Sequence, residues 1–323
     1  MNIYSNIIQE VNHLSEEGIP FLLLVDFEGK KPSLYKIDEL TQESIWIDFP
    51  NFRNNYSKPS QPVRVEAYVP VGKKKYKQAY DIVHRNLMYG NSFLTNLTMP
   101  TPLWLSASML DLYLDAQSKY KVFFKDQWCC FSPEIFVRIQ NGKIVSYPMK
   151  GTIDAAIPDA DKIILQNEKE TAEHYTIVDL IRNDLSKVAS NVNVKRFRYI
   201  DTIHTTHKTL LQVSSEICGD LPDDWRARLG DILFSLLPAG SVSGAPKEKT
   251  LDIIREAERE ARGFYTGVAV YFDGECVDSC VMIRFVERYQ DHYRYRSGGG
   301  ITVYSNTAEE YQELNDKIYV PRI

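Results

Sequence analysis

The stretch Tyr147-Pro148-Met149-Lys150-Gly151-Thr152 is the centre around which this sequence is organised. The apolar run before it, residues 143–147, is typical of a β-strand, and Gly151-Thr152 predicts a turn directly after Lys150. In a partly dry cleft, loss of hydration would lower the pKa of this lysine and make it a nucleophile or base. A solvated lysine in a hairpin turn is the alternative that the motif alone leaves open.

The composition is that of a soluble globular protein. The chain has 323 residues, 44% of them hydrophobic and 25% charged, which is enough to build a large core. Its net charge of -5 includes no basic block, which argues against a nucleic-acid surface. The first ten residues lack the pattern of a signal peptide, no window resembles a membrane span, and the five cysteines have no metal or disulfide spacing. We therefore expect a cytoplasmic protein that contacts neither nucleic acid nor membrane.

Apolar periodicity predicts helices and strands that are mixed along the chain. Strands are expected at residues 19–27, 33–37, 92–99, 122–130, 135–139, 143–147, 192–199, 211–217, 265–271, 276–285, 293–296 and 301–304. Helices are expected at residues 72–89, 103–119, 161–189 in two pieces, 225–236, 246–262 and 308–318. There is no internal repeat and no low-complexity linker. The expected class is α+β with mostly antiparallel strands.

Two pairs of glutamates lie on predicted helices. Glu170 and Glu173 share one helical face, as do Glu310 and Glu313, with Lys317 one turn further on. Like charges at this spacing repel unless a cation lies between them, and Mg²⁺ takes one or two carboxylates together with water or substrate oxygens. Taken singly, each pair is also compatible with a solvated helix face, with Glu313 and Lys317 as an ordinary surface ion pair.

Three further features are suited to binding an anion. The small-residue loop at residues 238–247, which includes Ser243, opens a predicted helix and has free backbone N–H groups. Gly298-Gly299-Gly300, expected between two strands, allows the backbone to approach a carboxylate closely. Arg284 ends a predicted strand where a bidentate carboxylate contact is possible. Tyr265 could add a hydroxyl, although a core position is the commoner fate of such a residue. Together these features predict a site for a small polyanionic acid with bound Mg²⁺ and a lysine beside it.

The sequence resembles the chorismate-utilising enzymes, which include anthranilate synthase component I, aminodeoxychorismate synthase component I, and the isochorismate and salicylate synthases. The resemblance runs from about residue 90 to residue 317, and its motifs occur in the family's order. These motifs are Ser132-Pro133-Glu134, Pro148-Met149-Lys150-Gly151-Thr152, residues 169–174, residues 179–185, residues 238–247, Ile283-Arg284, Gly298-Gly299-Gly300 and residues 313–317. The fold that it implies has two large antiparallel sheets facing one another, helices outside, and the site in the cleft between the sheets. It further implies one chorismate-binding catalytic domain over residues 1–323, with a short β-rich part at 1–71 and a catalytic core at 72–320.

The residue before Gly-Thr distinguishes subgroups of this family. Anthranilate synthases usually have alanine there, whereas aminodeoxychorismate synthases have the lysine found here as Lys150. The resemblance implies that Lys150 attacks C2 of chorismate while the C4 hydroxyl leaves with help from Mg²⁺. Ammonia then adds at C4 and expels the lysine, which gives 4-amino-4-deoxychorismate, a precursor of 4-aminobenzoate for folate.

The same motif matching implies roles for the other site residues. Glu173 and Glu313 would hold Mg²⁺ directly, with Glu170 and Glu310 acting through water or behind the direct ligands. The residues expected to contact chorismate are Thr152, Ser243, Tyr265, Arg284, Gly298, Gly299, Gly300 and Lys317.

Three positions depart from the family pattern. Gln212 stands where the family usually has a histidine near the leaving hydroxyl, and glutamine cannot act as a general acid. Mg²⁺, water, or one of His204 and His207 would then assist departure of the hydroxide. Leu94 replaces a glutamine of the family. The region before residue 72 is shorter than in long members, whose N-terminal portion binds tryptophan, so we expect no tryptophan site here.

The sequence contains no Gly-x-Cys-x-Gly nucleophile turn of a glutaminase. Ammonia is therefore expected from a separate glutaminase partner or from solution. The alternatives left open are anthranilate formation, isochorismate or salicylate formation, and a non-catalytic chorismate-binding subunit.

Overall fold

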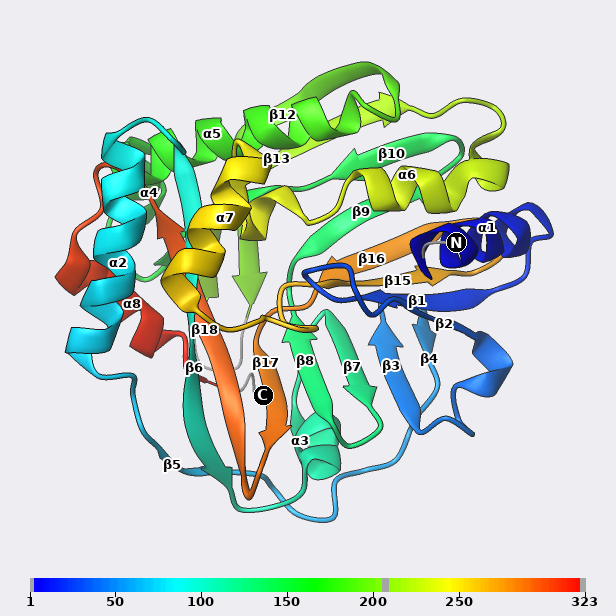
Figure 1. Ribbon diagram of the computed structural model, residues 1–323, viewed down its shortest axis with the longest axis horizontal. Helices are drawn as coiled ribbons and strands as arrows, with labels where there is room; N and C mark the ends of the chain where they lie inside the picture. The colour runs from blue at the N-terminus through cyan, green and yellow to red at the C-terminus, as the bar shows by residue number, and fades with distance from the viewer. Residues whose placement is uncertain (1–2, 205–208, 320–323) are drawn as a thin grey trace.

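The computed structural model describes residues 3–204 and 209–319, which form two large antiparallel sheets with helices around them (Figure 1). The strands of the first sheet are β1 Phe21–Val25, β2 Ser33–Lys36, β9 Ile135–Gln140, β10 Lys143–Ser146, β11 Met149–Asp154, β12 Ser190–His204, β13 Thr209–Asp220, β15 Val268–Phe272 and β16 Val277–Val281. Their order is β11-β13-β10-β9-β16-β15-β1-β2, with β12 also paired to β13.

The second sheet also has nine strands within the described residues. They are β3 Ile45–Phe49, β4 Phe52–Arg53, β5 Val65–Tyr68, β6 Leu94–Leu105, β7 Tyr120–Phe124, β8 Trp128–Ser132, β14 Gly244–Ala245, β17 Phe285–Tyr289 and β18 His292–Ile301. Their order is β14-β6-β18-β17-β8-β7-β3-β4, with β5 paired to β6. Both sheets therefore combine strands from the beginning and the end of the chain.

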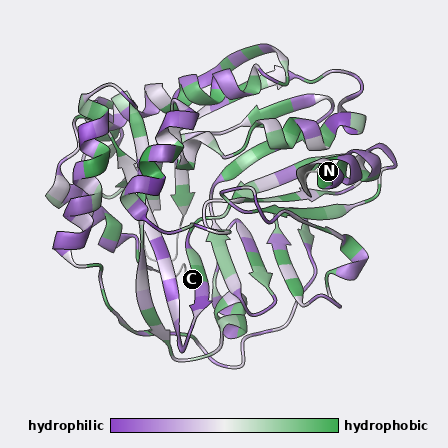
Figure 2. Cartoon of the chain, viewed as in Figure 1, coloured by the Kyte–Doolittle hydropathy of each residue, from purple (hydrophilic) through white to green (hydrophobic). Residues whose placement is uncertain are grey.

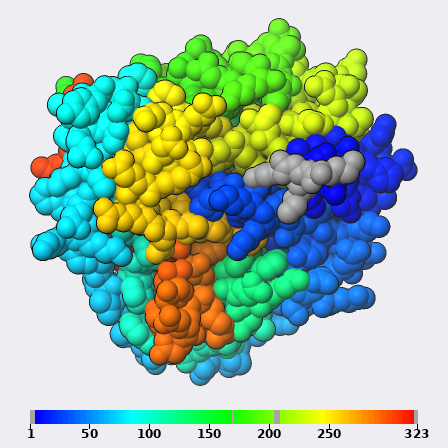
Figure 3. Space-filling view, in the orientation of Figure 1, coloured from blue at the N-terminus to red at the C-terminus, as the bar shows by residue number. Residues whose placement is uncertain are grey.

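The helices lie on the outside of the sheets (Figure 1). They are α1 Ile3–Glu16, α2 Lys73–Met88, α3 Met109–Asp115, α4 Ala160–Gln166, α5 Glu168–Leu185, α6 Leu229–Ser235, α7 Lys247–Glu258 and α8 Thr307–Asp316, with 3-10 turns η1 Ile37–Glu39, η2 Trp225–Arg228 and η3 Gly240–Val242. In the space-filling view α2 and α7, which are far apart in sequence, lie side by side (Figure 3). Across residues 3–204 and 209–319, no helix combines the length and the apolar character that crossing a membrane requires.

Strand β1 illustrates how the core is built. Leu22 and Leu24 belong to a buried cluster with Ile45 and Ile47 of the second sheet. Leu23, which points to the opposite face, belongs to the cluster formed with α1, α5 and α6. Because side chains alternate along a strand, a strand covered on both faces needs an unbroken apolar run, and Figure 2 shows such runs in the central strands. The predicted fold, α+β with two facing antiparallel sheets and helices outside, is confirmed.

Two of the predicted strands are in fact two strands each. Residues 122–130 contain parts of β7 and β8, joined by a tight turn in which Lys125 and Asp126 have φ of 50° and 52°. Residues 276–285 contain β16 of the first sheet and the start of β17 of the second. Arg284 lies where the chain passes between the sheets, with φ of 52°. Neither Gly nor Pro marks these breaks, so periodicity alone did not reveal them.

The prediction of a glycine loop between two strands is also wrong. Gly298-Gly299-Gly300 lies inside β18 and pairs with residues 96–98 of β6. A Cβ atom on Gly298 would lie only 2.3 Å from the carbonyl oxygen of Leu97, so glycine permits the close approach of the two strands. The predicted helix at 103–119 is likewise shorter, since residues 103–105 extend β6 and only α3 is helical.

A buried arginine connects the elements next to this glycine strand. Arg262, which is 1% exposed, donates hydrogen bonds to Glu258 of α7 at 2.6 and 2.9 Å and to the carbonyl oxygens of Val242 and Asn96, both at 2.7 Å. Glu258 also accepts a hydrogen bond from the backbone N–H of Thr98 at 2.9 Å. A buried charge is tolerated only when it is paired in this way. The network fixes α7, η3 and β6 relative to one another.

Candidate active site

Lys150 lies in β11, and Gly151-Thr152, which were predicted to form a turn directly after it, belong to the same strand. Three steps along β11, from Met149 to Thr152, match two steps along β13, so Lys150 and Gly151 form a bulge. Gly151 has φ of 80°, a conformation that glycine adopts without strain. The Lys150 amine approaches α5 and β18 from this bulge.

Carboxylates surround the Lys150 amine. Its Nζ lies 3.3 Å from Oε2 of Glu173, and the two side chains are 19% and 5% exposed. Burial lowers the pKa of Lys150, but the charges of Glu173, Glu170 and Glu134 together outweigh burial and raise this pKa above its ordinary value. The expected fall in pKa is therefore not what this arrangement produces. Lys150 is an ammonium held by acidic side chains.

The glycine strand β18 passes between the two pairs of glutamates. A Cβ atom on Gly300 would lie 3.1 Å from Oε2 of Glu173 and 3.2 Å from Nζ of Lys150. A Cβ atom on Gly299 would lie 3.2 Å from Oε1 of Glu313 and 3.6 Å from Oε2 of Glu310. The two predicted carboxylate pairs, more than a hundred residues apart in sequence, thus reach the same short stretch of backbone.

These carboxylates have the donor chemistry for a hard cation, but two of them are paired with lysines. Glu173 pairs with Lys150, and Glu313 pairs with Lys317 at 2.6 Å. In the part of the chain that is described, no three His, Cys, Asp or Glu side chains converge as a ready metal cluster. Mg²⁺ usually takes only one or two protein carboxylates and completes its shell with water and substrate oxygens. The donor chemistry therefore suits Mg²⁺ bound by few protein ligands.

Gln212 and Thr152 face each other across β11 and β13. They are directly paired in register, and Nε2 of Gln212 donates a hydrogen bond to Oγ1 of Thr152 at 3.3 Å. This contact places two of the predicted site residues next to each other. The alternative acids cannot be placed, because His207 and the side chain of His204 lie outside the described residues.

Arg284 is held in an uncommon backbone conformation and faces an aromatic ring. A non-glycine residue with φ of 52° requires support from its surroundings. Its guanidinium lies 5.0 Å from the ring centre of Tyr319, a cation–π distance. The hydroxyl of buried Tyr295 donates to the backbone oxygen of Tyr319 at 2.9 Å, which fixes the ring over the arginine. No sequence pattern indicated Tyr319, which follows α8 and lies outside every motif.

Lys317 contacts the backbone of the glycine strand β18. Its Nζ donates to the backbone oxygen of Gly298 at 2.9 Å as well as to Glu313.

Tyr265 is buried and its ring packs against Phe285, and burial raises the pKa of its hydroxyl. The phenol therefore stays protonated and can only act by hydrogen bonding.

Ser243 does not have the free hydroxyl that anion binding would use. The side chain is fully buried, and its Oγ donates to the carbonyl oxygen of Ala239 at 2.9 Å. This bond closes the small-residue turn that includes η3. Ser243 shapes the loop, and its position in a turn motif could not distinguish this role from ligand binding.

Glu134 is a site residue that sequence reasoning did not single out. Its carboxylate accepts a hydrogen bond from Ser241 and is within electrostatic range of Lys150 and Lys317. Burial raises the pKa of the Glu134 carboxyl, although the hydrogen bond and the two lysines act in the opposite direction. Glu134 belongs to the motif Ser132-Pro133-Glu134, and one carboxylate after a proline carries no chemical signal by itself.

Comparison with known proteins identifies the family of the chain. A family profile described as "chorismate binding enzyme" matches residues 22–322. An "Uncharacterized PabA-like protein" of Haemophilus influenzae is 46% identical over 97% of this chain and 96% of its own length. Aminodeoxychorismate synthase component 1 of Bacillus subtilis is 27% identical over 94% of this chain and 66% of its own. Among solved structures, anthranilate synthase component I from Streptococcus pneumoniae superposes with a TM-score of 0.67 at 26% identity, over 81% of this chain and 60% of that one. The chain therefore belongs to the family of chorismate-binding enzymes.

Proposed function

We propose that this protein aminates chorismate with ammonia to give 4-amino-4-deoxychorismate, the precursor of 4-aminobenzoate in folate synthesis. The observation that carries the proposal is the position of Lys150, 3.3 Å from Glu173 and next to Gly300. A lysine before Gly-Thr is the residue that separates aminodeoxychorismate synthases from anthranilate synthases in the resemblance described above. The similarity to the B. subtilis aminodeoxychorismate synthase component 1 supports the same activity.

Mg²⁺ is the proposed cofactor. Glu173 and Glu313 would bind it directly, and Glu170 and Glu310 would act through water. When bound, the cation supplies positive charge that stabilises the departing C4 hydroxyl group.

Lys150 is the proposed nucleophile. The Lys150 ammonium must first pass a proton to a neighbouring carboxylate, and Glu134 lies within electrostatic range to accept it. The free Nζ then forms a bond to C2 of chorismate as the C4–O bond breaks, and ammonia forms a bond to C4 as the C2–Nζ bond breaks. The departing hydroxide needs a proton, and Gln212 cannot supply one. Glu134 is suited to this role because its buried carboxyl has a raised pKa and faces the same lysine.

Cationic and amide groups of the candidate site are proposed to bind the two carboxylates of chorismate. Arg284 offers a planar guanidinium, and Lys317 and the glycine strand offer an ammonium and backbone N–H groups. Tyr265 and Thr152 would contribute hydroxyls. The ammonia would come from a separate glutaminase subunit, since the sequence has no glutaminase nucleophile turn.

Product analysis tests the proposal. Purified protein is incubated with chorismate, MgCl₂ and an ammonium salt, with and without an aminodeoxychorismate lyase, and the products are identified by mass spectrometry. Aminodeoxychorismate that becomes 4-aminobenzoate only with lyase is the expected result. Anthranilate, the alternative favoured by the S. pneumoniae relative, would overturn the role of Lys150, as would isochorismate or salicylate. Chorismate that remains unchanged would support a non-catalytic binding subunit.

A further inference from the structure

His174 is a buried side chain that the proposed reaction does not use. It directly follows Glu173 on α5, and its imidazole Nε2 lies 2.7 Å from Oγ of Ser215 on β13. Both residues are fully buried, so water does not compete for this hydrogen bond. Among the described residues, Ser215 is the hydrogen-bond partner of the ring. The bond therefore attaches α5 to β13 at the residue next to a proposed Mg²⁺ ligand.

Ser215 also holds the segment that carries Lys150. Its backbone N–H donates to the carbonyl oxygen of Pro148 at 3.0 Å, two residues before Lys150. Because Lys150 lies in the bulge of β11, the ladder between β11 and β13 is interrupted at the lysine itself. The bond to Pro148 therefore fixes the chain where it enters the bulge.

Strand β12 fixes the orientation of both partners. The backbone N–H of Arg198 donates to Oγ of Ser215 at 2.9 Å. Arg198 has φ of 47° and lies in a second bulge, in which three steps along β12 match two along β13. The ring of Phe197 packs edge-on against the His174 ring, with 5.8 Å between the ring centres. The hydroxyl and the imidazole are thus each held by a contact besides the bond that joins them.

These contacts close a circuit around the ion pair of the site. One branch runs from Ser215 through Pro148 to Lys150. The other runs from Ser215 through His174 to Glu173. The branches meet where Nζ of Lys150 lies 3.3 Å from Oε2 of Glu173. A lysine side chain is flexible, so the ion pair alone does not fix the spacing of α5 and β11. The short hydrogen bonds at Ser215 fix it instead.

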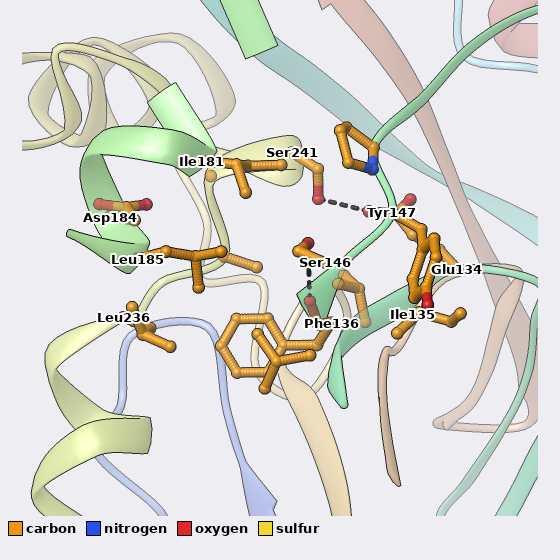
Figure 4. Close-up of a pocket in the computed structure, with 15 residues that line it drawn as sticks. Glu134, Ile135, Phe136, Ser146, Tyr147, Ile181, Asp184, Leu185, Leu236 and Ser241 are labelled. Carbon is orange, nitrogen blue, oxygen red and sulfur yellow. Dashed lines mark hydrogen bonds between the residues drawn. The ribbon is translucent and has the colours of Figure 1, made fainter. Parts of the chain in front are cut away.

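Glu134, another carboxylate near Lys150, is held by a separate contact. Figure 4 shows its hydrogen bond to Ser241 of η3, at the edge of a small cavity beside α5. This bond involves neither α5 nor β13. A disturbance at Ser215 would therefore move Glu173 relative to Lys150 and leave Glu134 in place.

We propose that His174 and Ser215 are positioning residues that set the distance between Glu173 and Lys150. The inference rests on the proposed function, in which Glu173 binds Mg²⁺ and Lys150 attacks chorismate. Neither His174 nor Ser215 touches the substrate in this mechanism. Loss of their bond leaves a buried polar group without its partner and frees α5 to move against β11.

Three substitutions and a matched control test the proposal. Ser215→Ala and His174→Leu remove the bond, whereas His174→Gln keeps a side-chain amide that can reach Ser215. The control is Ser279→Ala on β16. Ser279 is equally buried, and its hydroxyl is hydrogen-bonded to both backbone groups of Val137, outside the circuit. Both serine variants therefore lose a buried, hydrogen-bonded hydroxyl, and urea unfolding measures the cost in each.

The first measurement needs neither chorismate nor Mg²⁺. Acetic anhydride acetylates uncharged amines, and peptide mass spectrometry gives the rate at Lys150. Separation from Glu173 leaves more of this amine uncharged, so Ser215→Ala and His174→Leu should raise the rate about threefold at fixed pH, the equivalent of half a pKa unit. The second measurement is aminodeoxychorismate formation with saturating MgCl₂. The same two variants should lose about tenfold in kcat with little change in the KM for chorismate. His174→Gln and Ser279→Ala should resemble the unaltered protein in both measurements.

The outcomes separate a positioning role from a purely structural one. Unaltered acetylation and kcat in Ser215→Ala and His174→Leu would overturn the proposal, as would equal changes in Ser279→Ala. If circular dichroism shows that neither variant folds, Ser215→Cys is measured with the same expectations, because a thiol forms only a weak hydrogen bond. If the unaltered protein forms no aminodeoxychorismate, the proposed function fails, whereas the acetylation rates still decide the role of His174 and Ser215.

Discussion

Replacement of Gly300 by alanine tests the geometry of the candidate site most directly. The backbone N–H that is expected to face the substrate remains in this variant, and only a methyl group is added. That methyl would lie 3.0 Å from Cδ1 of Leu94, 3.1 Å from Oε2 of Glu173 and 3.2 Å from Nζ of Lys150. Because favourable contacts begin near 3.5 Å, the three neighbours must retreat by about 0.3–0.5 Å. The perturbation therefore acts between the proposed nucleophile and a proposed metal ligand.

The neighbours differ in how easily they can move. Leu94 is 2% exposed and packed in the core, so part of the cost appears as lost stability of about 1–3 kcal/mol. Glu173 and Lys150 can shift at their ends, but only by separating from each other. A misplacement of 1 Å in a catalytic site can cost about 100-fold in rate, so a shift of half that size should cost about tenfold.

Two other glycines provide a graded comparison. A methyl on Gly299 meets Oε1 of Glu313 at 3.2 Å, but the Glu313 side chain is 41% exposed and can swing aside. We expect Gly299→Ala to lose less activity than Gly300→Ala, because it displaces one proposed Mg²⁺ ligand but leaves the pair of Lys150 and Glu173 in place. A methyl on Gly72, at the start of α2, meets nothing within 4 Å, so Gly72→Ala should behave as wild type. Rates of aminodeoxychorismate formation and urea unfolding are compared for all three.

A Gly300→Ala protein that folds and turns over at the wild-type rate would refute the reasoning. Lys150, Glu173 and β18 would then not surround the reacting atoms. Equal losses in Gly299→Ala and Gly300→Ala would mean that a methyl group at either glycine impairs activity to the same extent. The contact with Lys150 and Glu173 would then not explain the loss in Gly300→Ala.

Three further variants follow from the same contacts. Lys150→Ala should abolish formation of aminodeoxychorismate while calorimetry still detects chorismate binding, and a wild-type rate would contradict covalent catalysis. Glu173→Gln should remove stimulation by MgCl₂, and an unaltered Mg²⁺ titration would show that this carboxylate is no ligand. Tyr319→Ala should raise the KM for chorismate by about two- to fivefold with kcat unchanged, the equivalent of one exposed cation–π contact with Arg284, whereas Tyr319→Phe should retain the wild-type KM. Identical KM values in both Tyr319 variants would exclude a role for the ring.

The sequence was informative where a signal is local. The apolar runs of β1 and β10 and the helical spacing of α2 were found within a few residues of their bounds. The helical spacing of the two glutamate pairs also placed each pair correctly on one helix. In each case the pattern extends over a few neighbouring residues, and tertiary packing reinforces it.

The sequence was least informative where a distant contact decides the structure. The bulge at Lys150 arises from pairing with β13, some sixty residues away. Gly298-Gly299-Gly300 reads as a loop locally, and its pairing with β6 makes it a strand. Glu134 becomes chemically distinctive only through burial and through the lysines that it faces. The raised pKa of Lys150 has the same origin, since acidic side chains from other elements outweigh the burial that the sequence argument considered.

The residues of the candidate site differ in how firmly their backbones are held. Lys150 and the three glycines belong to strands with partners, and Arg284 lies where the chain joins the two sheets. The end of α8 is attached differently, through side-chain hydrogen bonds with β18: Ser297 of β18 donates to the backbone oxygen of Leu314 at 2.9 Å, and Lys317, just after α8, donates to that of Gly298. Such contacts break individually, whereas a ladder of backbone hydrogen bonds opens only cooperatively. Adjustment to a bound substrate should therefore be concentrated at the end of α8, which carries Lys317 and, just beyond it, the ring that covers Arg284.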